Sequence, residues 1–159
     1  MKESDNFIAE QLMLQIGNKS VREYNVPKAI NFVLDSCLSD LPQRPRWVDG
    51  SGLSRYNLFS PQSMAFLLHK MYKEIPSKQL MSYFPQGGIE GTLQNDFEGQ
   101  KYIRAKSGTL SNNYCLSGYL TSKKGNVLIF SYMNNHYPGR SAERKEEMAI
   151  LFKNLYENY

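Results

Sequence analysis

The sequence predicts an α+β fold in which an antiparallel sheet of about three strands packs against several helices. Three extended runs follow one another without a helical segment between them, at residues 102–109, 114–121 and 126–133. The last two runs are joined by Lys123-Lys124-Gly125-Asn126, a composition typical of a hairpin turn. Helical patterns fill the first half of the chain and return at its end. With 159 residues, 41% of them hydrophobic, the chain is long enough for one domain with its own core.

The first helix is predicted from Asp5 to Ile16. It begins after a polar segment that can cap a helix, and it should end at Gly17-Asn18, a pair that commonly closes helices. The apolar residues that make the helical pattern are Phe7, Ile8, Leu12 and Ile16.

Proline marks the next two helix starts. Pro27 opens a second helix, because proline suits the first turn, where no N–H partner is needed. Ser60-Pro61 combines an N-cap residue with proline at the first helical position, and therefore begins a third helix. A short helix is predicted over residues 77–84. A final helix over residues 141–156 has an apolar stripe of Met148, Leu151, Phe152 and Leu155.

Composition and charge argue against nucleic-acid binding and against a metal site. The net charge is +4 with a pI near 9.0, but the basic residues are dispersed, which argues against nucleic acid as a partner. Cys37 and Cys115 lack metal-binding spacing. Cys115 lies in an apolar strand pattern and Cys37 in a helical one, which predicts buried thiols; a disulfide between them stays open. The two histidines have no second ligand nearby. We therefore expect no metal and no cofactor.

Two short motifs and a run between them carry the chemical information. Ser4-Asp5-Asn6 precedes a helix, Lys106-Ser107-Gly108-Thr109 ends a strand pattern, and residues 49–55 read Asp-Gly-Ser-Gly-Leu-Ser-Arg. Alone, the first motif is an ordinary helix cap, and the second occurs in many surface hairpins. Their order and setting match the S-D-N and K-T-G boxes of penicillin-recognising serine enzymes. The S-x-x-K box that would hold the nucleophile is absent, since no serine has lysine three residues later.

The chain resembles the C-terminal part of the D-alanyl-D-alanine carboxypeptidase/endopeptidases, the low-molecular-mass class C penicillin-binding proteins. Ser107 stands where that family more often has threonine, and it keeps the hydroxyl. Asn95-Asp96 occupy the neighbourhood in which the family usually has arginine. The residues that carry the resemblance run from position 3 to about 120: Glu3–Glu10, Asp49–Asn57, Gly91-Thr92-Leu93, Lys106–Leu110 and Leu116–Leu120.

The resemblance implies one domain organisation. Residues 1–159 are expected to be the C-terminal portion of a penicillin-binding domain, with the nucleophile-bearing portion and any extra domains upstream. The family's fold places a C-terminal helix over a three-stranded antiparallel sheet.

The resemblance also implies catalytic roles for Ser4, Asn6 and Lys106. The Ser4 hydroxyl would relay a proton to the leaving nitrogen. The Asn6 amide would hold the carbonyl on the acyl side of the substrate, and Asp5 would be structural. Lys106 would be the cation that attracts the substrate carboxylate and assists proton transfer through Ser4.

The rest of the third box would bind substrate. The hydroxyls of Ser107 and Thr109 would hold the terminal carboxylate. Gly108 would let the substrate backbone approach the strand edge and pair with it as an extra strand. The backbone N–H of Thr109 would be one of two oxyanion donors, the other belonging to the nucleophile.

We therefore expect the parent protein to be a serine-type D-Ala-D-Ala carboxypeptidase in the periplasm or another extracytoplasmic compartment. Its partners would be peptidoglycan stem peptides ending in D-Ala-D-Ala and β-lactam antibiotics, and DD-endopeptidase activity stays open. The chain alone should be inactive, and its exposed core surface should favour self-association. Two alternatives remain, a non-catalytic module that binds peptidoglycan peptides and a small basic interaction domain with coincidental motifs.

Overall fold

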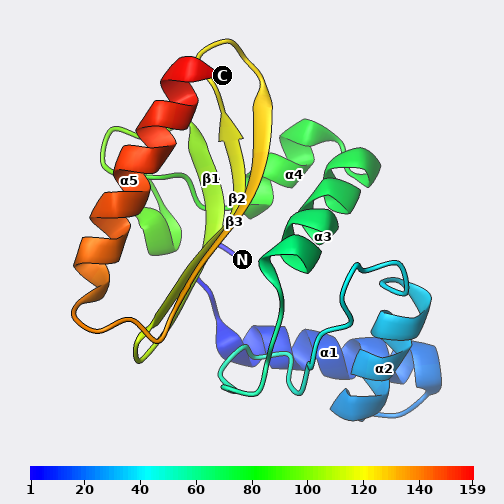
Figure 1. The fold of residues 1–159 in the computed structure, drawn as a ribbon. Helices are drawn as coiled ribbons and strands as arrows, with labels where there is room; N and C mark the ends of the chain where they lie inside the picture. The colour runs from blue at the N-terminus through cyan, green and yellow to red at the C-terminus, as the bar shows by residue number, and fades with distance from the viewer. The chain divides into compact units, whose positions relative to one another are not determined.

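The computed structural model describes residues 1–159 as two compact units. One comprises Met1–Ser4 and Leu68–Tyr159, and the other comprises Asp5–Leu67. The elements, in chain order (Figure 1), are α1 (Asn6–Val21), α2 (Val26–Ser36), α3 (Pro61–Glu74), α4 (Ser77–Tyr83), the 3-10 turn η1 (Gly91–Leu93), β1 (Ile103–Leu110), β2 (Asn113–Thr121), β3 (Val127–Asn135) and α5 (Ser141–Asn158).

The predicted three-stranded antiparallel sheet is confirmed. Its strand order is β1-β2-β3, so β1 is an edge strand. The register pairs Lys106 with Ser117 and Ser117 with Ser131. The bounds of the three predicted strands differ from the observed bounds by at most two residues at their ends. The α+β fold class predicted from the sequence is confirmed.

Helix α5 covers one face of the sheet (Figure 1). Met148 and Phe152 on this helix are fully buried against Leu116 and Leu120 of β2. Leu151, which the sequence placed on the same stripe, is 40% exposed, because it lies about 100° around the helix from Phe152. The helix end is fixed by Tyr156, whose ring stacks on Tyr102 at 4.0 Å between ring centroids.

Helix α4 and the last part of α3 lie on the other face of the sheet. Leu68, Leu80 and Phe84 form a buried cluster with Tyr119 of β2. The Tyr119 hydroxyl donates a hydrogen bond to the carbonyl of Leu68 at 2.8 Å. Burial, together with the neighbouring Tyr72, raises the pKa of Tyr119 to about 12, so this donor stays protonated at physiological pH.

The helical unit is built on α1 and α2. Asp5 is the N-cap of α1, and its side chain accepts a hydrogen bond from the Ile8 N–H at 2.8 Å. The predicted end at Gly17 is wrong, because the helix continues to Val21 and is capped by Arg22 with φ of 57°. A Cβ on Gly17 would lie 3.2 Å from the Cβ of Ala29, so this glycine permits close packing of α2.

The apolar residues of the predicted α1 pattern are exposed and do not form a core. Phe7 is 73% exposed, and Ile8, Leu12 and Ile16 are also exposed. The buried cluster of this unit instead contains Met13 with Ala29, Ile30 and Leu34 of α2. Helical periodicity identifies the apolar positions but does not specify which of them has a packing partner.

The remaining helix starts agree with the sequence. Asn25 caps α2 just before Pro27, and Ser60 caps α3 by accepting a hydrogen bond from the Ser63 N–H at 3.1 Å. The expectation of two buried thiols is wrong, since Cys37 is exposed and Cys115 is half-buried; the structure contains no disulfide. None of the helices combines the length and apolar character needed to span a bilayer.

Candidate active site

The free edge of β1 is open only along its second half. In the first half, the Ile103 carbonyl and the Ala105 N–H are hydrogen-bonded to residues 85–87, on the side away from β2. Backbone groups of alternate residues point to the same side of a strand. The N–H and C=O groups of Ser107 and Thr109 are therefore directed to the open edge, where an added strand could pair.

Lys106 is half-buried on the face of the sheet opposite α5. Its ammonium group donates to the carbonyl of Ser107, which is one of the groups directed to the free edge. Burial lowers the pKa of Lys106 below its ordinary value, because desolvation disfavours the charged form. An anionic ligand at this position would supply the missing compensation for the buried charge.

Gly108 provides open space at the centre of the box. A Cβ atom at this position would meet no atom within 4 Å, and both Gly108 and Thr109 are exposed. Nothing in the fold itself requires a glycine here on steric grounds. The open space over Gly108 is available to a ligand that approaches the strand edge.

The Ser107 hydroxyl has a partner that the sequence did not predict. Its Oγ donates to the Oγ1 of Thr92 at 3.0 Å. Thr92 belongs to η1, which packs beside β1. The only sequence signal for this contact was the tripeptide Gly91-Thr92-Leu93, to which no role had been assigned.

The residues of the first motif are divided between the two units. The Ser4 N–H donates to the Met1 carbonyl at 3.2 Å, which closes a β-turn, and Ser4 has φ of 52°. Ser4 thus belongs to the unit that holds Lys106–Thr109, whereas Asn6 is the first residue of α1 in the other unit. Asp5, which lies between Ser4 and Asn6 in the sequence, is the N-cap of α1. This structural position agrees with the role that the resemblance implied for Asp5.

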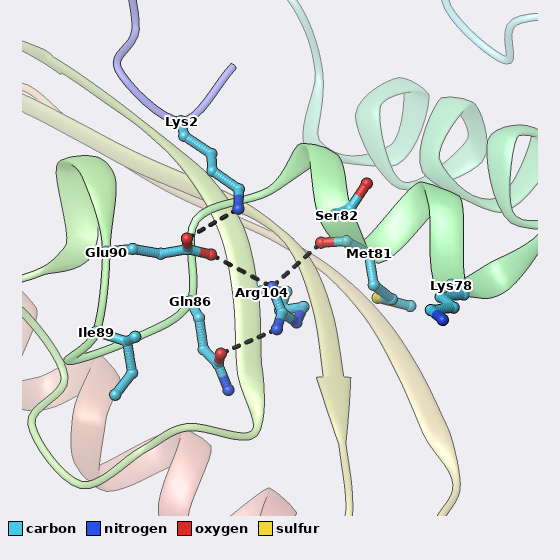
Figure 2. Close-up of a pocket in the computed structure, with 8 residues that line it drawn as sticks. All are labelled: Lys2, Lys78, Met81, Ser82, Gln86, Ile89, Glu90 and Arg104. Atoms are coloured by element: carbon cyan, nitrogen blue, oxygen red, sulfur yellow. Dashed lines mark hydrogen bonds and ion pairs between the residues drawn. The ribbon is translucent and has the colours of Figure 1, made fainter.

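A cavity of about 410 Å³ lies beside the first part of β1 (Figure 2). Its centre is the side chain of Arg104, which bonds to Gln86 at 2.9 Å and to Glu90 at 3.5 Å, and also reaches the carbonyls of Met81 and Phe84. Lys2 bonds to the same Glu90 carboxylate at 2.8 Å. The hydrogen bond from Lys2, with the charge of Arg104, holds the pKa of Glu90 below its usual value.

These contacts make the cavity a structural junction. The two terminal nitrogens of Arg104 are directed at protein acceptors on α4 and on residues 86–90 (Figure 2). The N-terminal turn joins the same junction through Lys2. The hydrogen bonds and ion pairs in this cavity therefore connect α4, residues 86–90 and the N-terminal turn around the start of β1.

The glycine-rich run forms a tight turn stabilised by carboxylates in the helical unit. The Asp49 carboxylate accepts hydrogen bonds from the N–H groups of Gly52 and Ser54 at 2.8 and 3.0 Å, and from the Asn57 amide at 3.0 Å. Partial burial alone would raise the pKa of Asp49, but these hydrogen bonds outweigh it and lower the pKa. Glu10 also accepts from the loop N–H groups at residues 50–51.

The Lys-Ser-Gly-Thr box on the edge strand β1 corresponds to the K-T-G box of penicillin-recognising serine enzymes. Residues 1–155 match the D-Ala-D-Ala carboxypeptidase 3 (S13) family, and the chain belongs to this family. The alternative of a basic domain with coincidental motifs is thereby excluded.

Individual relatives agree with this assignment. The D-alanyl-D-alanine carboxypeptidase DacB of Haemophilus influenzae is 31% identical over 179 residues, covering 98% of this chain and 35% of the relative. The crystal structure of penicillin binding protein 4 (dacB) from the same organism, in complex with a β-lactam, superposes with a TM-score of 0.85 at 27% identity. That match covers 99% of this chain and 40% of the other.

A more distant structure shares the fold. A predatory endopeptidase from Bdellovibrio bacteriovorus, solved with an immunity protein, has a TM-score of 0.77 at 19% identity, covering 98% of this chain and 41% of the other. The chain thus spans about a third of the length of its curated relative, and 40% or slightly more of the solved chains.

Proposed function

We propose that this chain supplies the second and third boxes of a serine-type D-Ala-D-Ala carboxypeptidase that acts on peptidoglycan stem peptides in an extracytoplasmic compartment. Residues 1–159 would form the C-terminal portion of its penicillin-binding domain. The nucleophile would come from a segment outside these 159 residues, which contain no S-x-x-K. We call the protein that joins this chain to such a segment the complete enzyme.

The observation that carries the proposal is the open half of the β1 edge. A peptide that pairs there would place its scissile carbonyl at the Thr109 N–H and its terminal carboxylate near Lys106. The lowered pKa of Lys106 supports this assignment, since a buried ammonium group without a charged partner is stabilised by a carboxylate ligand. The open space over Gly108 supports it too, because a ligand backbone can approach there.

The other roles follow from the same pose. The Ser107 and Thr109 hydroxyls would hold the carboxylate, which distinguishes a C-terminal D-Ala from an internal residue. Ser4 would relay the proton to the leaving amine, and Asn6 would hold the acyl-side carbonyl. β-lactams would occupy the same positions in the complete enzyme.

Intact-mass spectrometry after incubation with penicillin tests this function. We expect one acyl group per molecule on the complete enzyme, and none on the 159-residue chain, because the chain has no nucleophile. An unmodified complete enzyme would contradict peptidase activity and favour a non-catalytic module that binds peptidoglycan peptides. Replacing Lys106 with methionine in the complete enzyme should slow acylation at least about 100-fold if the lysine acts on the reacting ligand.

We further propose that the chain alone self-associates through the exposed apolar residues of α1. Phe7 and Leu12 are 73% and 60% exposed, whereas the buried residues of the same helix are Met13 and Gly17. Apolar groups of this size tend to be covered in an assembled protein.

A further inference from the structure

The tripeptide Gly91-Thr92-Leu93 forms η1 and has no part in the chemistry proposed so far. Leu93 is fully buried in the cluster that also contains Ile103 of β1 and Met148 of α5. This leucine anchors the 3-10 turn in the core. Its two neighbours are thereby held at fixed positions beside β1.

The segment that precedes Leu93 holds the N-terminal turn. The Thr92 N–H donates to the Lys2 carbonyl at 3.1 Å, and the Glu90 carboxylate bonds to the Lys2 ammonium at 2.8 Å. A Cβ on Gly91 would lie 2.6 Å from the Lys2 carbonyl oxygen, and Gly91 has φ of 57°. Lys2 is a central residue of the β-turn that ends at Ser4, so these contacts position Ser4.

The same segment also holds β1. The Thr92 Oγ1 accepts a hydrogen bond from the Ser107 Oγ at 3.0 Å. Glu90 pairs with Arg104 at 3.5 Å, two residues before Lys106 on the same strand (Figure 2). Three consecutive residues therefore contact both the turn that carries Ser4 and the strand that carries the third box.

We propose that Glu90-Gly91-Thr92 is a positioning clamp that fixes the Ser4 turn relative to Ser107 of β1. Within the function proposed above, the two hydroxyls act on opposite ends of the same leaving residue, Ser4 at its amine and Ser107 at its carboxylate. Their separation must match that residue, because misplacement of about 1 Å can cost a large factor in rate.

Thr92 acts through the hydroxyl of Ser107. Both groups can donate and accept, and each hydroxyl hydrogen can rotate. Without ligand, Ser107 donates to Thr92. With a carboxylate bound, Thr92 donates to Ser107, and the Ser107 hydrogen turns to the carboxylate. Valine has the shape of threonine but cannot make this exchange, whereas serine can.

The first test compares Thr92→Val and Thr92→Ser in the complete enzyme, with Thr121→Val as the matched control on an exposed strand end. We expect T92V to raise KM for a D-Ala-D-Ala peptide roughly 10-fold, T92S to stay within about 2-fold of wild type, and T121V to have no effect. If T92V and T121V behave alike, the clamp is excluded.

A double mutant separates positioning from general stability. If Thr92 acts through Ser107, adding T92V to Ser107→Ala should cause no further loss in kcat/KM. A loss of equal size in both backgrounds would show that Thr92 acts only on the fold. The free energy of unfolding of each variant, measured in urea, accompanies the kinetics.

Gly91→Ala tests the contact between the clamp and the Ser4 turn, and it replaces T92V as the test if T92V does not fold. The added Cβ should displace the Lys2 carbonyl and with it the Ser4 turn, so we expect kcat to fall at least 10-fold while KM changes little. An unchanged kcat would overturn this part of the proposal. If wild type is not acylated by penicillin, the proposed function itself fails. If wild type is acylated and S107A lowers kcat/KM, but T92V and G91A have no effect, only the clamp fails.

Discussion

Gly118 lies directly opposite Ala105 in the β1–β2 ladder, and a Cβ on Gly118 would come within 2.7 Å of the Ala105 Cβ. The same atom would overlap the Arg104 carbonyl oxygen, a backbone atom that cannot move without disturbing the strand. The strand that carries Lys106 therefore depends on a glycine in its neighbour.

Gly118→Ala should consequently destabilise the chain by about 2 to 4 kcal/mol, because close contacts with backbone atoms force the two strands apart. Urea unfolding followed by circular dichroism measures the change. Gly108→Ala is the matched control in the facing strand, since its Cβ would meet nothing within 4 Å. Equal stability losses for the two variants would contradict the assigned contacts.

Gly108→Ala should instead affect ligand binding. The methyl group would occupy the open space over the strand edge, where a peptide or β-lactam backbone is proposed to approach. We expect the rate of penicillin acylation of the complete enzyme to fall about 10-fold or more, with stability changed by less than about 1 kcal/mol. Unchanged acylation would exclude strand-edge binding at Gly108.

The pH dependence of stability should report the buried Lys106. Because its pKa is lower in the folded chain than in the unfolded chain, the unfolded chain binds more protons between the two values. The contribution of Lys106 to stability therefore increases as pH rises through this window. Lys106→Met should remove that increase, which lies below the ordinary lysine pKa of about 10.4, as measured by urea unfolding over a series of pH values up to that point.

Lys153→Met, at an exposed position on α5, is the control for Lys106→Met. We expect it to leave the pH dependence of unfolding close to that of the unmodified chain. If both lysine variants change the dependence equally, Lys106 is not distinguished by its burial.

Asp49→Asn should weaken the glycine-rich turn by roughly 1 to 3 kcal/mol, because several donors lose a charged acceptor. The lowered pKa of Asp49 gives the sign of the pH effect: its contribution is present above the unfolded pKa and is lost as pH falls through the folded pKa. Asp49→Asn should reduce that acid sensitivity. Asp35→Asn, which breaks only an exposed pair with Arg44, should change stability by less than about 1 kcal/mol.

The self-association of the 159-residue chain can be tested by sedimentation velocity over a range of concentrations. Replacing Phe7 and Leu12 together with serine should shift the chain toward monomer, since both side chains are exposed and apolar. Ile150→Ser on α5 is the control, because Ile150 is 67% exposed and lies in the other unit. A chain that is monomeric before any substitution would refute the proposal.

Sequence patterns predicted the sheet and most helix starts because their causes are local. Alternating apolar residues and a Gly-Asn turn specify β2 and β3, and Ser60-Pro61 specifies the start of α3. The end of α1 was mispredicted for the opposite reason. Gly17 resembles a C-cap in sequence, but the helix continues past it, and a Cβ there would meet the Glu23 carbonyl oxygen and the Ala29 side chain of a neighbouring helix.

The order and type of the residues in the boxes determined the family and the candidate residues by themselves, because that chemistry depends on which side chains occur at which spacing. Only the tertiary structure showed that the Thr109 backbone is directed to an open strand edge, that Lys106 is desolvated, and that Thr92 contacts Ser107. These facts depend on strand order, burial and the packing of a 3-10 turn 15 residues away from Ser107 in the chain. Such contacts leave no periodic signal in the sequence.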